Sequence, residues 1–114
     1  MTSSKSIDSS AFERLELRIG RIVDAQLNAK ARVPAFKLRI SFGDLGERTS
    51  SGQYTDFYTA QSLIGRDVVC AMNLGSIRIG GFESQVLVLG ARSDSGAPVL
   101  LIPEQGVSPG CEIF

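Results

Sequence analysis

The sequence predicts an all-β fold in which short strands close into a small barrel. Three observations support this prediction. Short segments rich in Val, Ile and Leu recur along the chain with turn residues between them, and several alternate apolar and polar residues. Only one short helix is expected in the middle of these strands. The 114 residues suit one domain with one core, and closure into a barrel removes the exposed edges of so small a sheet.

The N-terminal part is expected to be a flexible segment over residues 1–11, followed by a single domain over residues 12–114. Ser10 stands three residues before Glu13, and this capping-box spacing predicts a short helix there. The first residues hold no apolar stretch of the kind that a secretory signal needs. No run approaches the roughly 20 apolar residues that span a bilayer. We therefore expect a cytoplasmic protein without membrane insertion.

Two strands carry the clearest signals. From residue 17 the apolar period changes to two, which predicts a strand over residues 17–27. A glycine inside a strand marks a bend, so Gly20 is expected to curve this strand around the barrel. The segment FKLRISF, residues 36–42, alternates cleanly. It places Phe36, Leu38, Ile40 and Phe42 towards the core and Lys37, Arg39 and Ser41 towards solvent.

The remaining elements follow from the positions of turn residues and from hydrophobicity. The helix among them falls between the third and fourth strong strands, where the OB-fold has its helix, so the sequence predicts a five-stranded OB-fold barrel. These elements are a loop at 28–35, a turn and a polar strand at 43–55, a short helix at 56–65 ending at Gly65, a buried strand at 67–74, a Gly-rich loop at 75–82, a strand at 84–92, a turn at 93–98, a short strand at 98–103 and an extended tail at 109–114.

The charged and reactive side chains limit the function classes. Twelve basic and twelve acidic residues give no net charge, whereas a dedicated nucleic-acid-binding domain is usually basic. Residues 17–48 nevertheless hold seven basic and three acidic side chains, which form either a basic face or the solvated outer side of strands. The chain has no histidine, no carboxylate pair in apolar surroundings and two isolated cysteines. We therefore expect no enzyme, no metal site and no cofactor.

The most specific signal lies in five segments, LELRIGRIVDAQ, ARVPAFKLRISFG, SSGQYTDFY, VVCAMNLGSIRIGGFESQVLVLGA and PVLLIPEQGVSPGCEI. Together they resemble the tRNA-binding domain superfamily, most closely its stand-alone export-related chaperones of the CsaA branch. The resemblance covers residues 12–114 and implies an OB-fold core with a C-terminal β extension, arranged as a homodimer. It also implies binding of tRNA. For the chaperone branch it implies binding of unfolded or export-bound polypeptides and contact with the export machinery.

The resemblance also assigns candidate residues for binding RNA or peptide. Arg78 is expected to contact a phosphate, with Gly81 in the same loop. Asn73 and Ser84 either hold this loop towards the phosphate or only shape it. Superfamily members often have Lys-Pro or Pro-Arg after the asparagine, and this chain has Gly-Ser there, which removes a positive charge. The full candidate set is Ser50, Ser51, Gln53, Asn73, Arg78, Gly81 and Ser84.

Two functions remain open from the sequence. RNA binding needs a basic groove and weakens steeply with salt. Holding a polypeptide needs exposed apolar surface and tolerates salt. The neutral charge favours the polypeptide, and the resemblance favours RNA. Aromatic residues near the helix and the loops would stack on a base, line an apolar cleft or plug the barrel, and these are Tyr54, Phe57, Tyr58 and Phe82.

Overall fold

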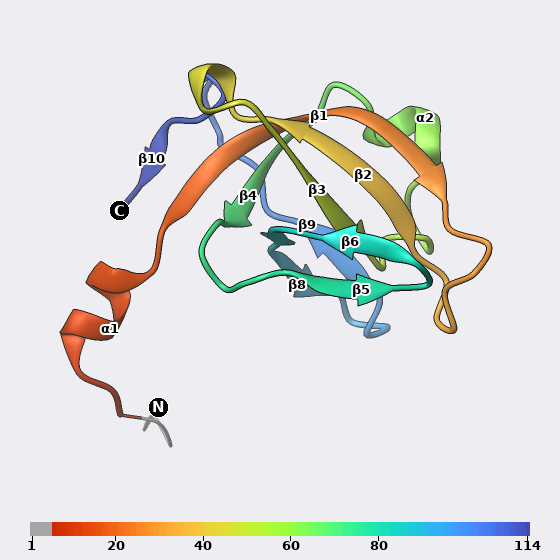
Figure 1. The fold of residues 1–114 in the computed structure, drawn as a ribbon, viewed down its shortest axis with the longest axis horizontal. Coiled ribbons are helices and arrows are strands. Elements are labelled where there is room, and N and C mark those ends of the chain that lie inside the picture. The colour runs from red at the N-terminus through yellow and green to blue at the C-terminus, as the bar shows by residue number, and fades with distance from the viewer. Residues whose placement is uncertain (1–5) are drawn as a thin grey trace.

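The computed structural model of the protein describes residues 6–114, and most of its elements wind into one barrel (Figure 1). Strands dominate and the helices are short, so the predicted all-β class is confirmed. In chain order the elements are α1 (Ser9–Arg14), β1 (Leu17–Leu27), β2 (Phe36–Ser41), the 3₁₀ turn η1 (Gly43–Leu45), β3 (Glu47–Gly52), α2 (Ala60–Leu63), β4 (Asp67–Ala71), β5 (Ile77–Ile79), β6 (Phe82–Ser84), β7 (Leu87–Val88), β8 (Gly90–Arg92), β9 (Pro98–Leu100) and β10 (Glu112–Ile113).

Five antiparallel strands form the barrel wall in the order β3-β2-β1-β4-β7. β1, β2 and β3 are consecutive in the chain, and α2 lies in the chain between β3 and β4. The barrel closes where the backbone carbonyl of Thr49 in β3 accepts hydrogen bonds from the amides of Gln85 (2.8 Å) and Val86 (3.1 Å). This arrangement confirms the predicted OB-fold-like barrel.

Side chains complete the closure of the barrel. The Thr49 amide donates to Oε1 of Gln85 at 3.0 Å, and the Ser51 amide donates to Oγ of Ser84 at 2.9 Å. Two amides of β3 are therefore satisfied by side-chain oxygens instead of by the carbonyls of a neighbouring strand. We call this junction between β3 and residues 84–86 the seam.

The predicted inner face of β2 is confirmed. Phe36, Leu38 and Ile40 are buried, and Phe42, just after the strand, is buried as well. Because successive side chains in a strand point to opposite faces, this places Lys37 and Arg39 outside. The core also draws on β1, β4 and the chain around β7. Its members are Ile22, Ala25, Phe36, Leu38, Ile40, Phe42, Tyr54, Leu63, Val68, Cys70, Val86 and Val88.

The irregularity in β1 does not lie at Gly20, where the sequence predicted a bend. The pairing of β1 with β4 runs regularly through Gly20, whereas its pairing with β2 shifts between Ile22 and Asp24. This bulge resets which side chains face outwards. Gly20 allows close packing, because a Cβ there would lie 2.5 Å from Cγ2 of Ile40.

The short helix α1 begins differently from the prediction. The Oδ1 atom of Asp8 caps it by accepting a hydrogen bond from the Ser10 amide at 3.2 Å, so the predicted Ser10–Glu13 capping box is wrong. A carboxylate is favoured at this position because it also complements the partial positive charge of the helix start. Of the segment predicted to be flexible, residues 1–5 lie outside the described residues and residues 9–11 belong to α1.

The helix predicted within residues 56–65 is present as α2. Thr59 and Ser62 form its capping box, in which each side chain accepts a hydrogen bond from the backbone amide of the other residue. Gly65 follows with a φ of 90°, a conformation that favours glycine after a helix end, as the sequence predicted.

The Gly-rich segment at residues 75–82 forms a β-hairpin and not the predicted loop. β5 pairs with β6 across Gly80 and Gly81, whose φ angles of 55° and 78° suit a tight two-residue turn. The strand predicted at residues 84–92 is divided among β6, β7 and β8. The division has a physical reason, since Gln85 and Val86 turn aside to bond β3 at the seam.

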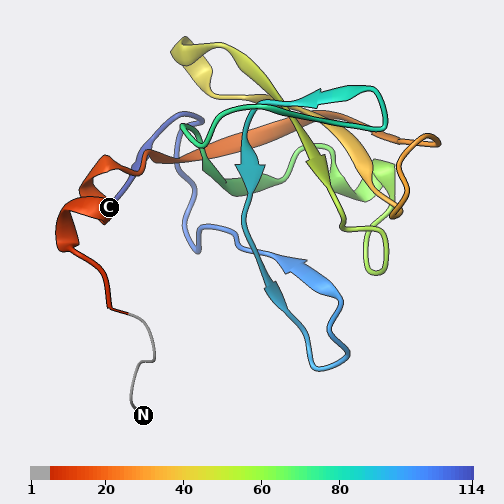
Figure 2. The same cartoon turned by 60° about the horizontal axis from the view of Figure 1, so that its bottom comes forward.

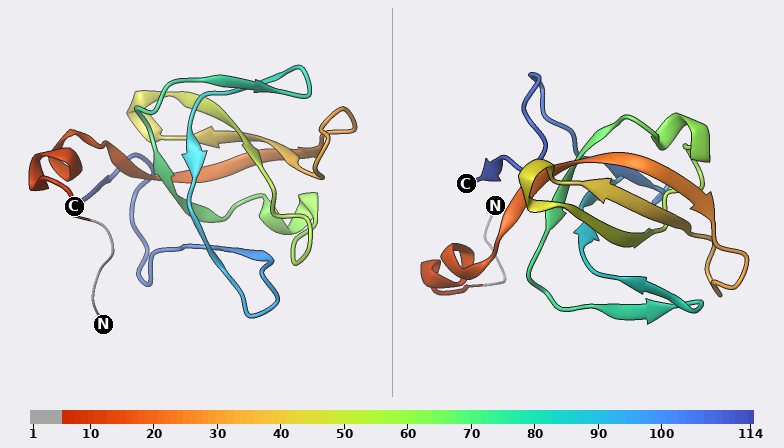
Figure 3. Two further views of the ribbon diagram at one scale, coloured as in Figure 1. Left: turned by 90° about the horizontal axis from the view of Figure 1, so that it is seen from below. Right: turned by 45° about the horizontal axis from the view of Figure 1, so that its top comes forward.

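The C-terminal part extends the barrel, as the resemblance implied. β8 and β9 form a second hairpin that projects from the barrel (Figure 2). β10 then pairs with the first residues of β1, so that the C-terminus and α1 lie on the same side of the molecule (Figure 3). Four apolar side chains of this part are exposed, namely Leu101, Ile102, Val107 and Phe114.

Candidate nucleic-acid interface

The outer face of β1, β2 and β3 carries polar side chains in two rows that cross the strands. In one row Gln26 of β1 lies opposite Lys37 of β2. In the other row Asp24 lies opposite Arg39, which in turn lies opposite Thr49 of β3. These residues face outwards because their neighbours along the strands fill the core.

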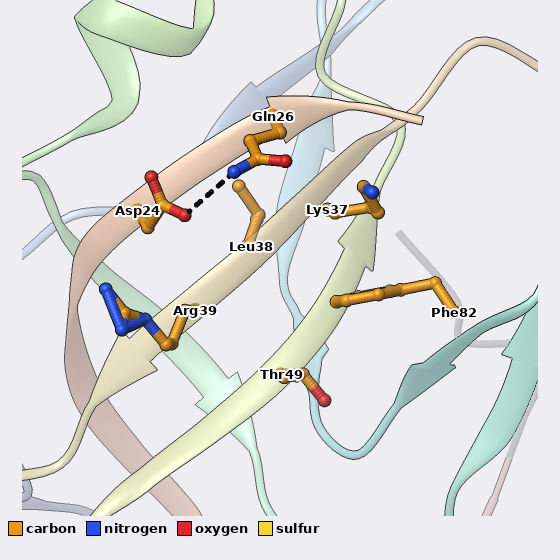
Figure 4. Close-up of a pocket in the computed structure, with 7 residues that line it drawn as sticks. All are labelled: Asp24, Gln26, Lys37, Leu38, Arg39, Thr49 and Phe82. Carbon is orange, nitrogen blue, oxygen red and sulfur yellow. Dashed lines mark hydrogen bonds between the residues drawn. The ribbon is translucent and has the colours of Figure 1, made fainter. Parts of the chain in front are cut away.

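A groove of about 190 Å³ lies over these rows (Figure 4). Phe82 extends from β6 across β3 on one side of it, and Asp24 and Gln26 line the other side. Lys37 stands between Gln26 and Phe82, and the Arg39 side chain extends from β2 towards the side of Asp24. We call this the outer groove, and its lining residues are Asp24, Gln26, Lys37, Leu38, Arg39, Thr49 and Phe82.

The two cations of the outer groove are available to a ligand. Within residues 6–114 the Lys37 ammonium group has no hydrogen bond or ion pair. Nε of Arg39 lies 3.5 Å from Oε1 of Glu47, and both side chains are 50% exposed. An ion pair so exposed to water contributes little, so a phosphate group can replace it at small cost.

The outer groove continues into a second hollow of about 290 Å³, which shares Lys37 and Phe82 with it. Here Asn28 joins the loop after β1 to the hairpin β5–β6. Its Nδ2 donates to the Ile79 carbonyl at 3.1 Å, and its Oδ1 accepts from the Lys30 amide at 3.0 Å. The buried Asn28 side chain therefore fixes the hairpin that carries Phe82 over the groove.

Arg78 and Gly81, two of the predicted site residues, lie together in this hairpin. The exposed Arg78 donates from Nη1 to the Gly81 carbonyl at 2.9 Å. Its cross-strand partner is Glu83. Arg78 is accessible to a ligand, although its guanidinium already bonds the turn and faces a carboxylate across the hairpin.

The predicted serines lie at the seam. Ser84 accepts a hydrogen bond from the Ser51 amide, and its own hydroxyl donates to the Val86 carbonyl at 3.3 Å. Ser50 is fully buried inside the barrel, opposite Leu38. Among the described residues its hydroxyl has no hydrogen-bond partner. These positions shape the barrel wall on which the outer groove lies.

Asn73 lies apart from the other predicted residues. Its Oδ1 accepts from the Glu16 amide at 2.9 Å, and its Nδ2 donates to the Arg14 carbonyl at 2.7 Å. The side chain thus ties the end of β4 to the connection between α1 and β1. The structure does not bring it together with Arg78 or Gly81 through a hydrogen bond.

Gln53, with Ser51, lines a larger hollow of about 400 Å³ between the end of β3 and the two hairpins. At the edge of this hollow the hydroxyl of Tyr54 donates to the Val88 carbonyl at 3.0 Å. Burial raises the pKa of Tyr54 to about 12. We call this hollow the apolar groove. Its apolar side chains are Tyr54, Ile79, Leu87, Val88, Ala91 and Pro98, and Arg92 lines it as well.

Several residues of the outer groove were absent from the predicted site. The alternation in residues 36–42 does place Lys37 and Arg39 outside, and Phe82 is one of the aromatic residues for which the sequence leaves stacking, lining a cleft and plugging the barrel open. No pattern in the sequence indicates that Asp24, Gln26 or Asn28 belongs to the site. The bulge in β1 sets the direction of the first two, and only the fold brings Asn28 to the hairpin.

A metal-ligand cluster and a membrane-spanning helix are both absent from the part of the chain that the structure describes. Within residues 6–114 no three His, Cys, Asp or Glu side chains gather as metal ligands. None of the helices there is long and apolar enough to cross a membrane. What the outer groove presents instead is a set of cations beside an aromatic ring, which is the combination that binds nucleic acid backbones and bases.

Comparison with known proteins agrees with this class of site. A family model described as a putative tRNA binding domain matches residues 17–112, and the chain belongs to that family. The methionine–tRNA ligase of Archaeoglobus fulgidus is 36% identical over 113 residues, and that of Nitrosomonas eutropha is 34% identical. The chain spans only 17% and 15% of the lengths of these two ligases.

Within the family, the chain is similar to the CsaA chaperones. A crystal structure of the chaperone CsaA from Bacillus anthracis is 40% identical, with a TM-score of 0.90, and the match covers 96% of this chain and 100% of that one. The CsaA chaperone protein from Picrophilus torridus is 36% identical, with a TM-score of 0.89 and the same coverage. The resemblance read from the sequence is thus confirmed.

Proposed function

We propose that this protein is a CsaA-like cytoplasmic binding protein that acts as a homodimer and catalyses no reaction. It binds structured RNA, namely tRNA, and serves as a chaperone for export-bound polypeptides, with the export machinery as a further partner. The observation that carries the RNA proposal is the outer groove, where Lys37 and Arg39 stand beside Phe82 on the β1–β2–β3 face. The family model and the CsaA structures support the choice of partners.

Elementary forces explain how such a groove holds RNA. Each phosphate contact made by a lysine or arginine releases counterions, which gives affinity without sequence preference. An aromatic ring adds stacking, worth about 1–3 kcal/mol for each base. Lys37 and Arg39 supply the first contribution and Phe82 the second. The predicted site residues Arg78 and Gly81 lie in the same hairpin as Phe82, and we propose that they line the path of the RNA backbone.

Salt dependence tests the RNA proposal. Changing Lys37 to Gln removes one positive charge and keeps a side chain of similar length. We expect weaker tRNA binding and a plot of log affinity against log salt that is flatter by about 0.7–0.9. The matched control is Arg14→Gln on α1, which removes a charge on a helix away from the groove. An unchanged slope for Lys37→Gln would count against the outer groove as the RNA site.

The apolar groove favours a second activity, the holding of polypeptides. Its volume of about 400 Å³ and its apolar lining suit side chains of an unfolded segment. We propose that Ser51 and Gln53 at its edge bond the backbone of that segment. Contacts of this type persist at high salt, because burial of apolar surface does not depend on charge.

The alternative is a chaperone that holds polypeptides without physiological RNA binding. The net charge of zero favours it, as do Asp24 opposite Arg39 and Glu83 opposite Arg78. Both proposals can be tested on one preparation, by measuring capture of an unfolded protein and of tRNA as salt is raised. If tRNA fails to bind even at low salt while client capture persists, the alternative is the correct function.

A further inference from the structure

We propose that the outer groove takes one unpaired base of its RNA and prefers guanine, an inference that rests on the proposed RNA binding. The groove has the size for a single base. A closed cavity of about 150 Å³ admits benzene, so the open groove of about 190 Å³ beside Phe82 has room for one ring system. Proteins that recognise RNA by sequence do so on unpaired bases stacked on aromatic rings.

The preference for guanine comes from Asp24. Guanine is the base whose pairing edge presents two adjacent N–H donors, N1–H and the N2 amino group, and a carboxylate offers two oxygens that accept both. Oδ2 of Asp24 accepts a hydrogen bond from Nε2 of Gln26 at 3.4 Å. Within residues 6–114 this is the one hydrogen bond to the Asp24 carboxylate, which is in no ion pair.

The cations of the groove complete the match. Guanine carries two further acceptors, O6 and N7, and Lys or Arg is their usual partner. Arg39 is the cross-strand neighbour of Asp24, and Lys37 is that of Gln26, so donors and acceptors alternate on the two strands. Across the groove from Phe82, this surface therefore offers an acceptor for the donor side of guanine and donors for its acceptor side.

The other bases fit this arrangement less well. Uracil presents one N–H between two carbonyl oxygens, and both of these oxygens repel a carboxylate. Adenine and cytosine each place an amino group beside a ring nitrogen that accepts but cannot donate. For these bases Asp24 contributes mainly repulsion of the phosphates. The carboxylate lowers affinity for RNA in general and raises it for guanine.

Because Asp24 has opposite effects on the affinity for guanine and for the other bases, removing its charge tests the inference. The probes are short oligouridylates that carry one central guanosine, adenosine or cytidine, compared with the all-uridine oligomer and with tRNA. The variants are Asp24→Asn in the groove, Phe82→Leu at the stacking ring, and Asp44→Asn as control. Asp44 lies exposed in η1 and does not line the groove, so Asp44→Asn changes the net charge by the same amount at another place.

We expect the wild-type protein to prefer the guanosine oligomer about tenfold over the others. Asp24→Asn should abolish the preference and at the same time bind the all-uridine oligomer more tightly. Asp44→Asn should keep the preference. Phe82→Leu should weaken binding of every oligomer, by about tenfold, because stacking does not depend on base identity.

Two results would overturn the inference, namely equal binding of the four oligomers, and a guanosine preference that survives Asp24→Asn. Either result leaves the proposed function intact as long as tRNA binding depends on Lys37. If neither tRNA nor any oligomer binds, the proposed RNA function fails, and the preference fails with it. The two failures are therefore distinguishable within one set of titrations.

Discussion

Ser50 illustrates how a single polar side chain can oppose the stability of the barrel. Its hydroxyl is fully buried and has no hydrogen-bond partner among the described residues, whereas the hydroxyl of Ser84, also on the barrel wall, bonds two backbone groups. A buried hydroxyl without a partner loses its bonds to water and gains nothing in return. Ser50 is therefore oriented towards the core, where no macromolecular partner reaches it.

We predict that Ser50→Ala raises the free energy of unfolding by about 1 kcal/mol, because it removes an unsatisfied polar group and little volume. Ser51→Ala is the control on the same strand. It changes a side chain that forms no hydrogen bond of its own within residues 6–114, since the bond at this position comes from the backbone amide. Chemical denaturation measures both. A loss of stability in Ser50→Ala would show that the hydroxyl does have a partner.

Burial of Cys70 makes the free energy of unfolding depend on pH in the alkaline range. Burial raises the pKa of this thiol from 9.0 to about 12. The unfolded chain thus releases the proton at a lower pH than the folded chain does. The free energy of unfolding is unaffected well below pH 9 and decreases as the pH rises from 9 towards 12.

The corresponding prediction compares the two cysteines. Between about pH 8 and 10, Cys70→Ala should show a smaller loss of stability with rising pH than the wild-type protein, measured by urea denaturation. Cys111→Ala removes the other cysteine, which lies near the surface. It should retain the wild-type decline. Identical slopes for all three proteins would mean that the Cys70 thiol is not protected by burial.

Among the elements, the hairpin β5–β6 matters most, because it carries Phe82 over the outer groove. Two contacts set its position on the barrel, the Asn28 bridge to Ile79 and the close approach of Gly80 to the loop after β1. A Cβ on Gly80 would lie 2.8 Å from the Ala31 nitrogen and would force hairpin and loop apart.

Substitution of the two turn glycines tests this packing. Both have positive φ, so alanine at either costs about 1–2 kcal/mol of backbone strain. A Cβ on Gly81 meets nothing within 4 Å, so Gly81→Ala should cost no more than that strain. We predict a larger loss of stability for Gly80→Ala, together with weaker tRNA binding, since the Phe82 ring shifts with the hairpin. Equal losses would refute the contact with the loop.

The same elements show what the sequence predicts well and what it does not. Strong alternation predicted β2 and its buried face, because every second residue there is large and apolar. The sequence predicts a loop at this hairpin because strands of three residues each are too short to establish a period. Residues 84–92 are divided among three strands because Gln85 and Val86 bond Thr49, a residue far away in the chain. The local sequence pattern does not indicate these hydrogen bonds.

At the scale of the whole molecule, the resemblance across nearly the full chain predicted the barrel and its C-terminal extension. The candidate site was harder to predict, because it depends on register. A shift by one residue moves a side chain to the other face of a strand, and the bulge between Ile22 and Asp24 is such a shift. The two cross-strand rows of the outer groove exist only after that shift, which leaves Asp24 and Gln26 on the outer face.

The exposed C-terminal part supports the proposed homodimer. Phe114 is 99% exposed and Ile102 is 60% exposed, and large apolar side chains with this exposure are available to a partner subunit. We predict a dimer by light scattering at micromolar concentration and a shift to monomer for Ile102→Asp. The control Val33→Asp alters a side chain 54% exposed in the loop after β1, at the other end of the barrel (Figure 1). A wild-type monomer would contradict the proposal.

The seam gives the barrel a place to open. Elsewhere the wall is joined by ladders of backbone hydrogen bonds, but at the seam the Thr49 and Ser51 amides bond the side chains of Gln85 and Ser84. A side chain can rotate away while the strands stay in place, so these amide protons should exchange with solvent deuterium earlier than those between β1 and β2. Thr49 also lines the outer groove, so a bound ligand would slow their exchange. The rate at which the wall opens would then report on whether the groove is filled.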